Sequence, residues 1–165
     1  MHKEVKDYIE KIKLRFPDKF KDVSVLEFGS LNVNGTPRFF FDNCFYVGVD
    51  KIAGEGVDIV SNAHEYETDE RFDVVITTEM LEHDENAEKS IQNALRLLKD
   101  GGLFIGTAAN VNREPHYAYL NYGNGVADEY YKNISREFLE NIGIKDIEED
   151  NKQHDIRFIW QKPIL

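Results

Sequence analysis

Acidic side chains follow two short apolar runs in the first third of the chain. Glu27 lies at the end of Val23–Phe28, and Asp50 follows Phe45–Val49. A carboxylate at the first position would repel a pyrophosphate and would suit a cation, whereas an acid at the second can accept hydrogen bonds from ribose hydroxyls. The structural alternatives are a capping or salt-bridged carboxylate at Glu27 and a turn-forming residue before Gly54 at Asp50.

The turn after the first run lacks the glycines of a dinucleotide site. That fingerprint would need glycine at positions 29, 31 and 34, and the chain has Gly29, Leu31 and Asn34. This failure and the charge of Glu27 both count against a nicotinamide-dependent oxidoreductase. We expect Asn32 and Asn34 to take positive φ angles, which asparagine tolerates better than most residues.

A second group of ionisable residues follows the run 72–77. Glu79, Glu82 and His83 stand at i, i+3 and i+4, so they would share one face of a helix and could bind a divalent metal, with His116 as a fourth ligand. The alternative is that Glu82 and His83 cap the next helix and lie near the substrate, and we expect this metal-free outcome. His83 and His116 are then the candidate general bases, because imidazole titrates near neutrality.

Residues 110–133 form a long stretch without periodicity that is rich in tyrosine and asparagine and contains Arg113 and His116. Loops of this length in a compact domain are usually functional or disordered. We expect it to cover the site and to contact a polar organic acceptor such as a sugar or a phenol. An ordered flap that packs on itself is the alternative.

Five short apolar runs and three amphipathic segments indicate how these residues are positioned. The runs do not alternate with polar residues, which is typical of strands buried on both faces; they are Val23–Phe28, Phe45–Val49, Val57–Val60, Phe72–Thr77 and Leu103–Thr107. Helices are predicted within 1–17, from a cap at Asp84 to Asp100-Gly101-Gly102, and from Ser135 to Gly143. Two further strands, Ile144–Glu148 and Ile156–Gln161, are expected in the tail.

This order predicts an α/β fold over residues 1–165 as one domain. The sheet should be Rossmann-like and open, mostly parallel with an antiparallel C-terminal hairpin strand, and covered by helices on both faces. Only residues 50–56 separate the second strand from the third, so the helix usual at that crossover is expected to be missing or vestigial.

Composition limits the partners and the cellular location that we expect for the protein. The 165 residues carry a formal charge of −11, which argues against a nucleic-acid partner, and the single cysteine, Cys44, excludes a disulfide framework. The chain lacks an apolar stretch of membrane-spanning length and a signal peptide, so we expect a cytoplasmic protein with no membrane partner. The oligomeric state is left open.

Five motifs in order resemble those of the class I S-adenosylmethionine-dependent methyltransferases, close to the methyltransferase type 11 group. They are Val25-Leu26-Glu27-Phe28-Gly29-Ser30, Tyr46-Val47-Gly48-Val49-Asp50, Asn62-Ala63-His64, the segment 72–83, and the segment 97–105. The departure is a first loop with only Gly29 and Gly35, which bears on cofactor affinity. The ubiquinone-pathway and small-RNA 2′-O-methyltransferases have a similar Glu-x-x-Glu-His, tied to a metal in those proteins.

The resemblance implies S-adenosylmethionine as the cofactor and assigns residues to it. These are Glu27, Gly29, Ser30, Leu31, Asp50, Lys51, Ile52, Asn62, Ala63, His64, Thr78 and Glu79. The expected activity is transfer of a methyl group to a small-molecule polar acceptor, at a hydroxyl. The alternatives are a protein that keeps the fold and binds the cofactor without catalysis, and the less favoured oxidoreductase.

Overall fold

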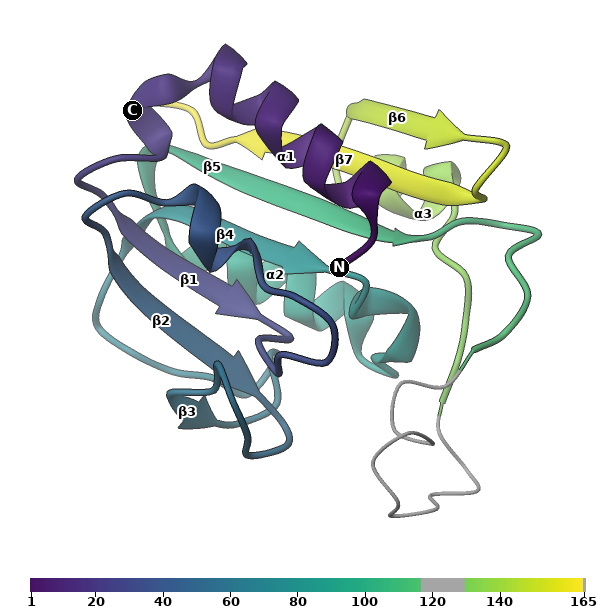
Figure 1. The fold of residues 1–165 in the computed structure, drawn as a ribbon, viewed down its shortest axis with the longest axis horizontal. Coiled ribbons are helices and arrows are strands. Elements are labelled where there is room, and N and C mark those ends of the chain that lie inside the picture. Colours follow the sequence, from purple (N-terminus) through teal and green to yellow (C-terminus); the bar gives the residue numbers. More distant parts are fainter. Residues whose placement is uncertain (117–129, 165) are drawn as a thin grey trace.

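The computed structural model describes residues 1–116 and 130–164. Within these residues one sheet contains seven strands in the order β3-β2-β1-β4-β5-β7-β6 (Figure 1). Their bounds are β1 Ser24–Phe28, β2 Phe45–Asp50, β3 Ile59–Val60, β4 Phe72–Thr78, β5 Leu98–Ala109, β6 Asp146–Asp150 and β7 Asp155–Gln161. The pairs among β1 to β5 are parallel, and β7 pairs antiparallel with both β5 and β6. The predicted α/β fold is therefore confirmed, including the antiparallel hairpin.

Helices cover both faces of the sheet, as predicted (Figure 1). The helices are α1 Lys3–Arg15, α2 Ala87–Leu97 and α3 Arg136–Asn141, with 3₁₀ turns η1 Pro17–Lys19, η2 Pro37–Phe40 and η3 Leu81–His83. The apolar stripe of α1 packs with Val25, Val74 and Leu103 on one face. On the other face, residues of α2 and α3 pack with Leu26, Val75 and other core residues of the central strands. Burial on both faces explains why apolar residues in these strands do not alternate with polar ones.

The ends of two helices differ from the sequence expectation. The helix α2 ends at Leu97, and Leu98 pairs with Phe72 as the first residue of β5, because tertiary pairing overrides the helical pattern there. Asp84 is not the N-cap of α2: that position belongs to Asn86, whose backbone N–H donates to the Asp84 carboxylate at 2.8 Å. The helix α3, predicted from Ser135 to Gly143, extends from Arg136 to Asn141, and Ser135 is its N-cap, whose hydroxyl accepts from the backbone N–H of Phe138.

The connection between β2 and β3 contains no helix in residues 51–58, as the short spacing predicted, and β3 is only two residues long. In the turn after β1 the positive φ angles belong to Gly29 and Gly35, at 80° and 118°. The expectation for Asn32 and Asn34 was wrong; the side-chain oxygen of Asn32 instead accepts from the backbone N–H of Gly35 at 2.8 Å.

No helix in the described ranges combines the length and the apolar character that crossing a bilayer requires.

Candidate active site

Two adjoining cavities open at the carboxyl ends of β1, β2 and β4. The larger has a volume of about 560 Å³ and the smaller about 330 Å³. Gly29, Asp50, Met80 and His83 line both. Ligands of open α/β sheets bind outside this edge, so the cavities lie where the strand order predicts a site.

Every predicted cofactor residue except Ser30 lines one of the two cavities. The larger cavity contains Gly29, Asp50, Lys51, Ile52, Asn62, Ala63 and His64. The smaller adds Glu27, Leu31, Thr78 and Glu79. The Ser30 side chain is buried against β2 instead, where a Cβ atom on Gly48 would lie 2.8 Å from its hydroxyl oxygen. The fold thus gathers residues from four of the five motifs around one recess.

The turn after β1 requires glycine at its first position. Gly29 has a φ of 80°, and a Cβ atom there would lie 2.6 Å from the Cβ of Met80. The backbone N–H groups of Gly29 and Ser30 both donate to the carbonyl of Val49, at 2.9 and 3.2 Å. The turn is therefore fixed to β2 by its backbone, and it brings the ends of β1 and β4 into close contact.

Asp50 ends β2 with its carboxylate at the mouth of both cavities. One oxygen accepts from the backbone N–H of Leu31 and the other from that of Ile52, each at 3.0 Å. These bonds fix the plane of the carboxylate, and each oxygen keeps a further lone pair for a ligand hydroxyl. The same bonds hold the turn after β1, so Asp50 also has a structural role.

Glu27 is only 2% exposed and lines the smaller cavity. Burial raises the pKa of its carboxyl to about 8, although a hydrogen bond from the Tyr46 hydroxyl and the charge of Arg38 both act to lower it. The Tyr46 oxygen lies 2.9 Å from Oε2 of Glu27. The carboxyl is therefore a poorly solvated group that a bound cation would stabilise in its charged form.

The turn at residues 62–64 lines the larger cavity. The Asn93 side chain on α2 holds it by donating to the carbonyls of Ala63 and Tyr66, at 2.8 and 2.9 Å. The Asn62 amide donates to Glu65 at 2.7 Å. This turn and Asp50 line the same cavity.

Glu79 follows β4 in a left-handed backbone conformation, with a φ of 53°. Its N–H donates to the carbonyl of Thr107, and its Oε1 accepts from the Thr107 hydroxyl, both at 2.9 Å. The expectation that Glu79, Glu82 and His83 share one helical face was wrong, since only the last two belong to the single turn η3. The left-handed residue places Glu79 before the turn η3, where its side chain contacts Thr107 of β5.

Glu82, His83 and His116 form a cluster beside the cavities, each offering one ligand atom within 4.8 Å of the others. The three rings of His83, His116 and Tyr131 stand edge to face, with centroids 5.1 to 5.4 Å apart. Burial, together with the charges of His116 and Lys51, lowers the pKa of His83 to about 4. His83 is therefore neutral at neutral pH.

Glu82 is fully buried behind these rings. Its Oε1 accepts from the backbone N–H of Ala109 at 3.2 Å, and its Oε2 has no hydrogen-bond partner in the described structure. Burial and then the charge of Glu79 raise the pKa of Glu82 well above its usual value. A protonated Glu82 can donate a hydrogen bond.

The ligand atoms of the cluster lie within 4.8 Å of one another, compared with roughly 3.3 Å between ligand atoms around a tetrahedral zinc at about 2.0–2.1 Å. Glu79, expected as a ligand in the metal hypothesis, contacts Thr107 and Arg113 instead. Glu82, His83 and His116 are the described residues that could hold a metal after a rearrangement of their side chains.

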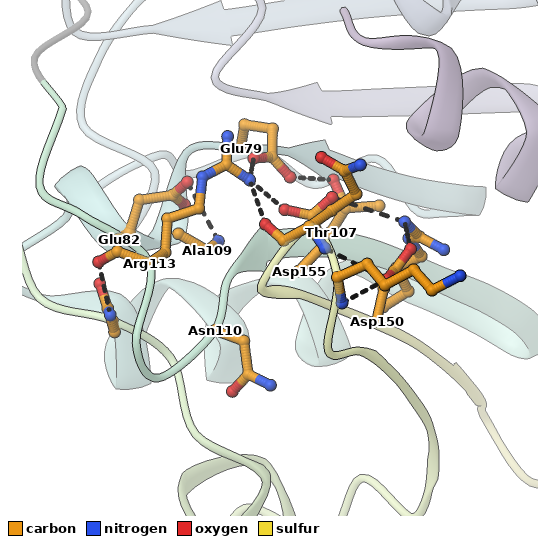
Figure 2. A network of polar contacts seen from close by, with 12 residues as sticks. Glu79, Glu82, Thr107, Ala109, Asn110, Arg113, Asp150 and Asp155 are labelled. Atoms are coloured by element: carbon orange, nitrogen blue, oxygen red, sulfur yellow. Dashed lines mark hydrogen bonds and ion pairs between the residues drawn. The ribbon is translucent and has the colours of Figure 1, made fainter.

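The two described ends of the segment 110–133 are fixed to the site. Arg113 lies between Glu79 and Asp155 (Figure 2), with Nη1 3.8 Å from Oε2 of Glu79 and in direct contact with Asp155. The Asn133 amide donates to the carbonyl of Arg113 at 3.1 Å, and the Lys132 N–H donates to the carbonyl of Glu82 at 2.8 Å. Residues 117–129 of the predicted substrate-side loop lie outside the described residues.

Sequence reasoning missed two side chains at this site: Met80, which lines both cavities, and Tyr46, which contacts Glu27. Tyr130, which lines the larger cavity, belongs to the segment 110–133 that was expected to cover the site. Met80 follows directly from the rule that residues after each strand face the ligand. The contact of Tyr46 depends on the register of β1 with β2, in which Tyr46 pairs with Val25, two residues before Glu27.

Solved methyltransferase structures share this fold. An N-methyltransferase, NodS, from Bradyrhizobium japonicum superposes with a TM-score of 0.63 at 14% identity, covering 97% of this chain and 96% of that chain. A Burkholderia thailandensis 1,6-didemethyltoxoflavin N1-methyltransferase, solved with S-adenosylhomocysteine, has a TM-score of 0.65 at 14% identity over 91% and 75%. An S-adenosylmethionine-dependent methyltransferase from Clostridium acetobutylicum has a TM-score of 0.64 at 13% identity over 95% and 90%.

A search of curated proteins found no match. The family model described as a methyltransferase domain matches residues 1–145, which include both cavities and the Glu82 cluster. This match agrees with the motifs, with the sheet order and with the Glu27 carboxylate, which is suited to a cation. It counts against the oxidoreductase alternative. The chain belongs to the methyltransferase-domain family, as a class I enzyme whose cofactor is S-adenosylmethionine.

Proposed function

We propose that this enzyme transfers the methyl group of S-adenosylmethionine to a small polar acceptor, at a hydroxyl oxygen. The observation that carries the proposal is the arrangement of the two cavities. Glu27 and Asp50, carboxylates suited to a cationic nucleoside, line the same cavities as the histidine pair. His83 lines both cavities and His116 lines the smaller one, so a proton acceptor adjoins the cofactor position.

In this proposal the cofactor occupies the recess in an order set by the side chains. The ribose hydroxyls donate to Asp50, and the adenine lies against Asn62, Ala63 and His64. The methionine part extends past Gly29 toward Glu27, Thr78 and Glu79, with Leu31, Lys51 and Ile52 along the nucleoside. Ser30 supports the turn from beneath, through its packing against β2.

Methyl transfer is an in-line displacement in which an acceptor lone pair attacks the sulfonium methyl opposite the sulfur. Holding the two reactants in line can supply several kcal/mol through proximity and orientation. A hydroxyl acceptor must also lose its proton. His116, or His83 in its place, takes that proton as general base, and Glu82 lies behind them as a buried carboxyl group.

The remaining expectations on partners follow the same chemistry. We propose a small-molecule acceptor, no nucleic-acid partner because of the net charge of −11, and a cytoplasmic location.

The test has two stages. S-adenosylhomocysteine binding is measured by calorimetry, and then S-adenosylmethionine consumption is followed with matched panels of small phenols and sugars, amines and thiols. Binding together with turnover of a hydroxyl compound supports the proposal. Turnover of amines alone would replace the hydroxyl by nitrogen. Binding without any turnover across all panels would favour a protein that binds the cofactor without catalysis.

A further inference from the structure

Glu27 is held by a chain of side chains that reaches from β1 across β2 to the protein surface. Tyr46 precedes the middle of β2 and stands diagonally beside Glu27, because the register pairs Val25 with Tyr46 and Glu27 with Gly48. Side chains two residues apart share one face of a sheet. The Tyr46 hydroxyl therefore reaches Oε2 of Glu27, at 2.9 Å.

Tyr46 remains a hydrogen-bond donor at physiological pH. Burial raises the pKa of the Tyr46 phenol well above its usual value, and the Glu27 carboxylate raises it further. A phenol that keeps its proton stabilises the charged form of the acid it donates to. The hydrogen bond also fixes one oxygen of Glu27, which leaves the other to meet a ligand in the smaller cavity.

Arg38 lies beneath the Tyr46 ring and completes the chain. Its guanidinium carbon is 4.4 Å from the ring centroid, and Nη2 bonds Asp58 at 2.7 Å. Asp58 in turn accepts from the backbone N–H of Gly48 at 2.7 Å. This arrangement keeps a positive charge under the ring without direct contact with Glu27, and cation–π attraction stabilises it there.

The charged groups around Glu27 act in opposite directions. Tyr46 and Arg38 favour the carboxylate, whereas burial and the charges of Asp50 and Asp58 favour the protonated acid. The balance places the pKa of Glu27 near neutrality, at about 8. Loss of the Tyr46 hydroxyl would shift that pKa upward.

We propose that Tyr46 and Arg38 are positioning residues that hold Glu27 as an oriented carboxylate for the ammonium group of the cofactor's methionine part. The inference rests on the proposed function, which places the methionine part beside Glu27. Neither residue touches the cofactor in this proposal. Both act through the charge and the orientation of Glu27.

The experiment compares Tyr46→Phe with the parent by calorimetry from pH 6.5 to 9.5. The ligands are S-adenosylhomocysteine, which has the ammonium group, and 5′-methylthioadenosine, which has the nucleoside and lacks the amino acid. We expect Tyr46→Phe to weaken S-adenosylhomocysteine binding about ten-fold at pH 7, the usual cost of a lost hydrogen bond to a charged group, and to leave 5′-methylthioadenosine unchanged.

The sign of the pH dependence separates positioning from a structural effect. An upward shift of the Glu27 pKa in Tyr46→Phe weakens binding at any pH where the acid is protonated. The loss of S-adenosylhomocysteine affinity relative to the parent should therefore be greatest below about pH 8. Above that pH the affinities of the two proteins should become similar. The amine of the ligand titrates identically in both proteins, so the ratio of the two affinities reports Glu27. Tyr8→Phe, which alters a buried tyrosine of α1 on the same sheet face, is the matched control and should show no change.

Two results would overturn the inference: an unchanged affinity for S-adenosylhomocysteine in Tyr46→Phe, or an equal, pH-independent loss for both ligands. Should Tyr46→Phe fail to fold, Arg38→Gln at the half-exposed guanidinium gives the same readout, with a smaller loss in the same direction. A parent protein that binds neither ligand would contradict the proposed function itself, which distinguishes the two failures.

Discussion

Arg113 and Glu79 meet where the segment after β5 crosses the end of β4, with Nη1 3.8 Å from Oε2 of the carboxylate. The same guanidinium contacts Asp155 at the start of β7. One guanidinium thus contacts two carboxylates, one directly after β4 and one at the start of β7. Burial and then the charge of Asp155 raise the pKa of Glu79, and Arg113 opposes this rise. The contact joins the acceptor side of the site to the C-terminal hairpin.

Replacing Arg113 by Gln should destabilise the protein. Breaking a buried ion pair costs about 3–5 kcal/mol, and the 21% exposure of the Arg113 side chain reduces this to about 1–3 kcal/mol of unfolding free energy. Urea denaturation measures it. The control is Lys99→Gln, at a more exposed pair with Asp73, where less than about 1 kcal/mol is expected. If both variants lost the same unfolding free energy, the Arg113 contacts would contribute no more to stability than an exposed ion pair.

Asp50→Ala should weaken S-adenosylhomocysteine binding by about 1–3 kcal/mol, the cost of losing hydrogen bonds to a charged group. The structure adds a second consequence, because the carboxylate also accepts from the backbone of Leu31 and Ile52. A moderate loss of unfolding free energy should accompany the loss of affinity. Adenine, which has no ribose, serves as the control ligand and should bind both proteins equally. If Asp50→Ala kept the full affinity for S-adenosylhomocysteine, the proposed placement of the ribose at Asp50 would be wrong.

The histidine variants identify the general base through the pH dependence of the rate. With a hydroxyl acceptor, we expect the parent rate to fall below about pH 6.5, the ordinary histidine value, and His116→Ala to lose that acid limb along with about 10²–10⁴-fold of the rate. Cofactor affinity should change only a few-fold. A limb near pH 4 would instead assign the base to His83, whose pKa is lowered to about 4. Unchanged profiles in both His83→Ala and His116→Ala would point to an amine or thiol acceptor.

Glu82→Gln should change how stability depends on pH. The pKa of Glu82 in the folded protein is raised well above its usual value, so the folded state binds a proton that the unfolded state has already lost. Stability from this group is present below the unfolded pKa of about 4.3 and is lost as pH rises, by up to about 1.4 kcal/mol per pH unit. The variant should therefore gain stability relative to the parent between pH 5 and pH 8, measured by urea denaturation. A constant difference across that range would mean that Glu82 is ionised in the folded protein.

Turnover should be indifferent to a chelator. The ligand atoms of Glu82, His83 and His116 lie within 4.8 Å of one another, and Glu79 is engaged elsewhere. Rates before and after EDTA, with and without Mg²⁺, Mn²⁺ or Zn²⁺, provide the measurement. Loss of activity that a divalent ion restores would revive the metal hypothesis for this cluster.

The sequence by itself determined the α/β fold and the residues after each strand. Apolar runs without alternation can be buried only as the central strands of a covered sheet, and in such a sheet Glu27, Asp50 and Thr78 must end at one edge. The short spacing after Asp50 likewise excluded a crossover helix, because a helix needs more residues than the connection contains.

Only the tertiary structure decided which of these residues contact one another. The left-handed backbone of Glu79 leaves it outside the η3 turn that contains Glu82 and His83, although their spacing suits one helical face. The contact of Tyr46 with Glu27 depends on strand register, and that of Arg113 with Asp155 spans 42 residues. Spacing along the chain gives no distance between such groups, because register and backbone conformation are fixed by the packing of the whole sheet.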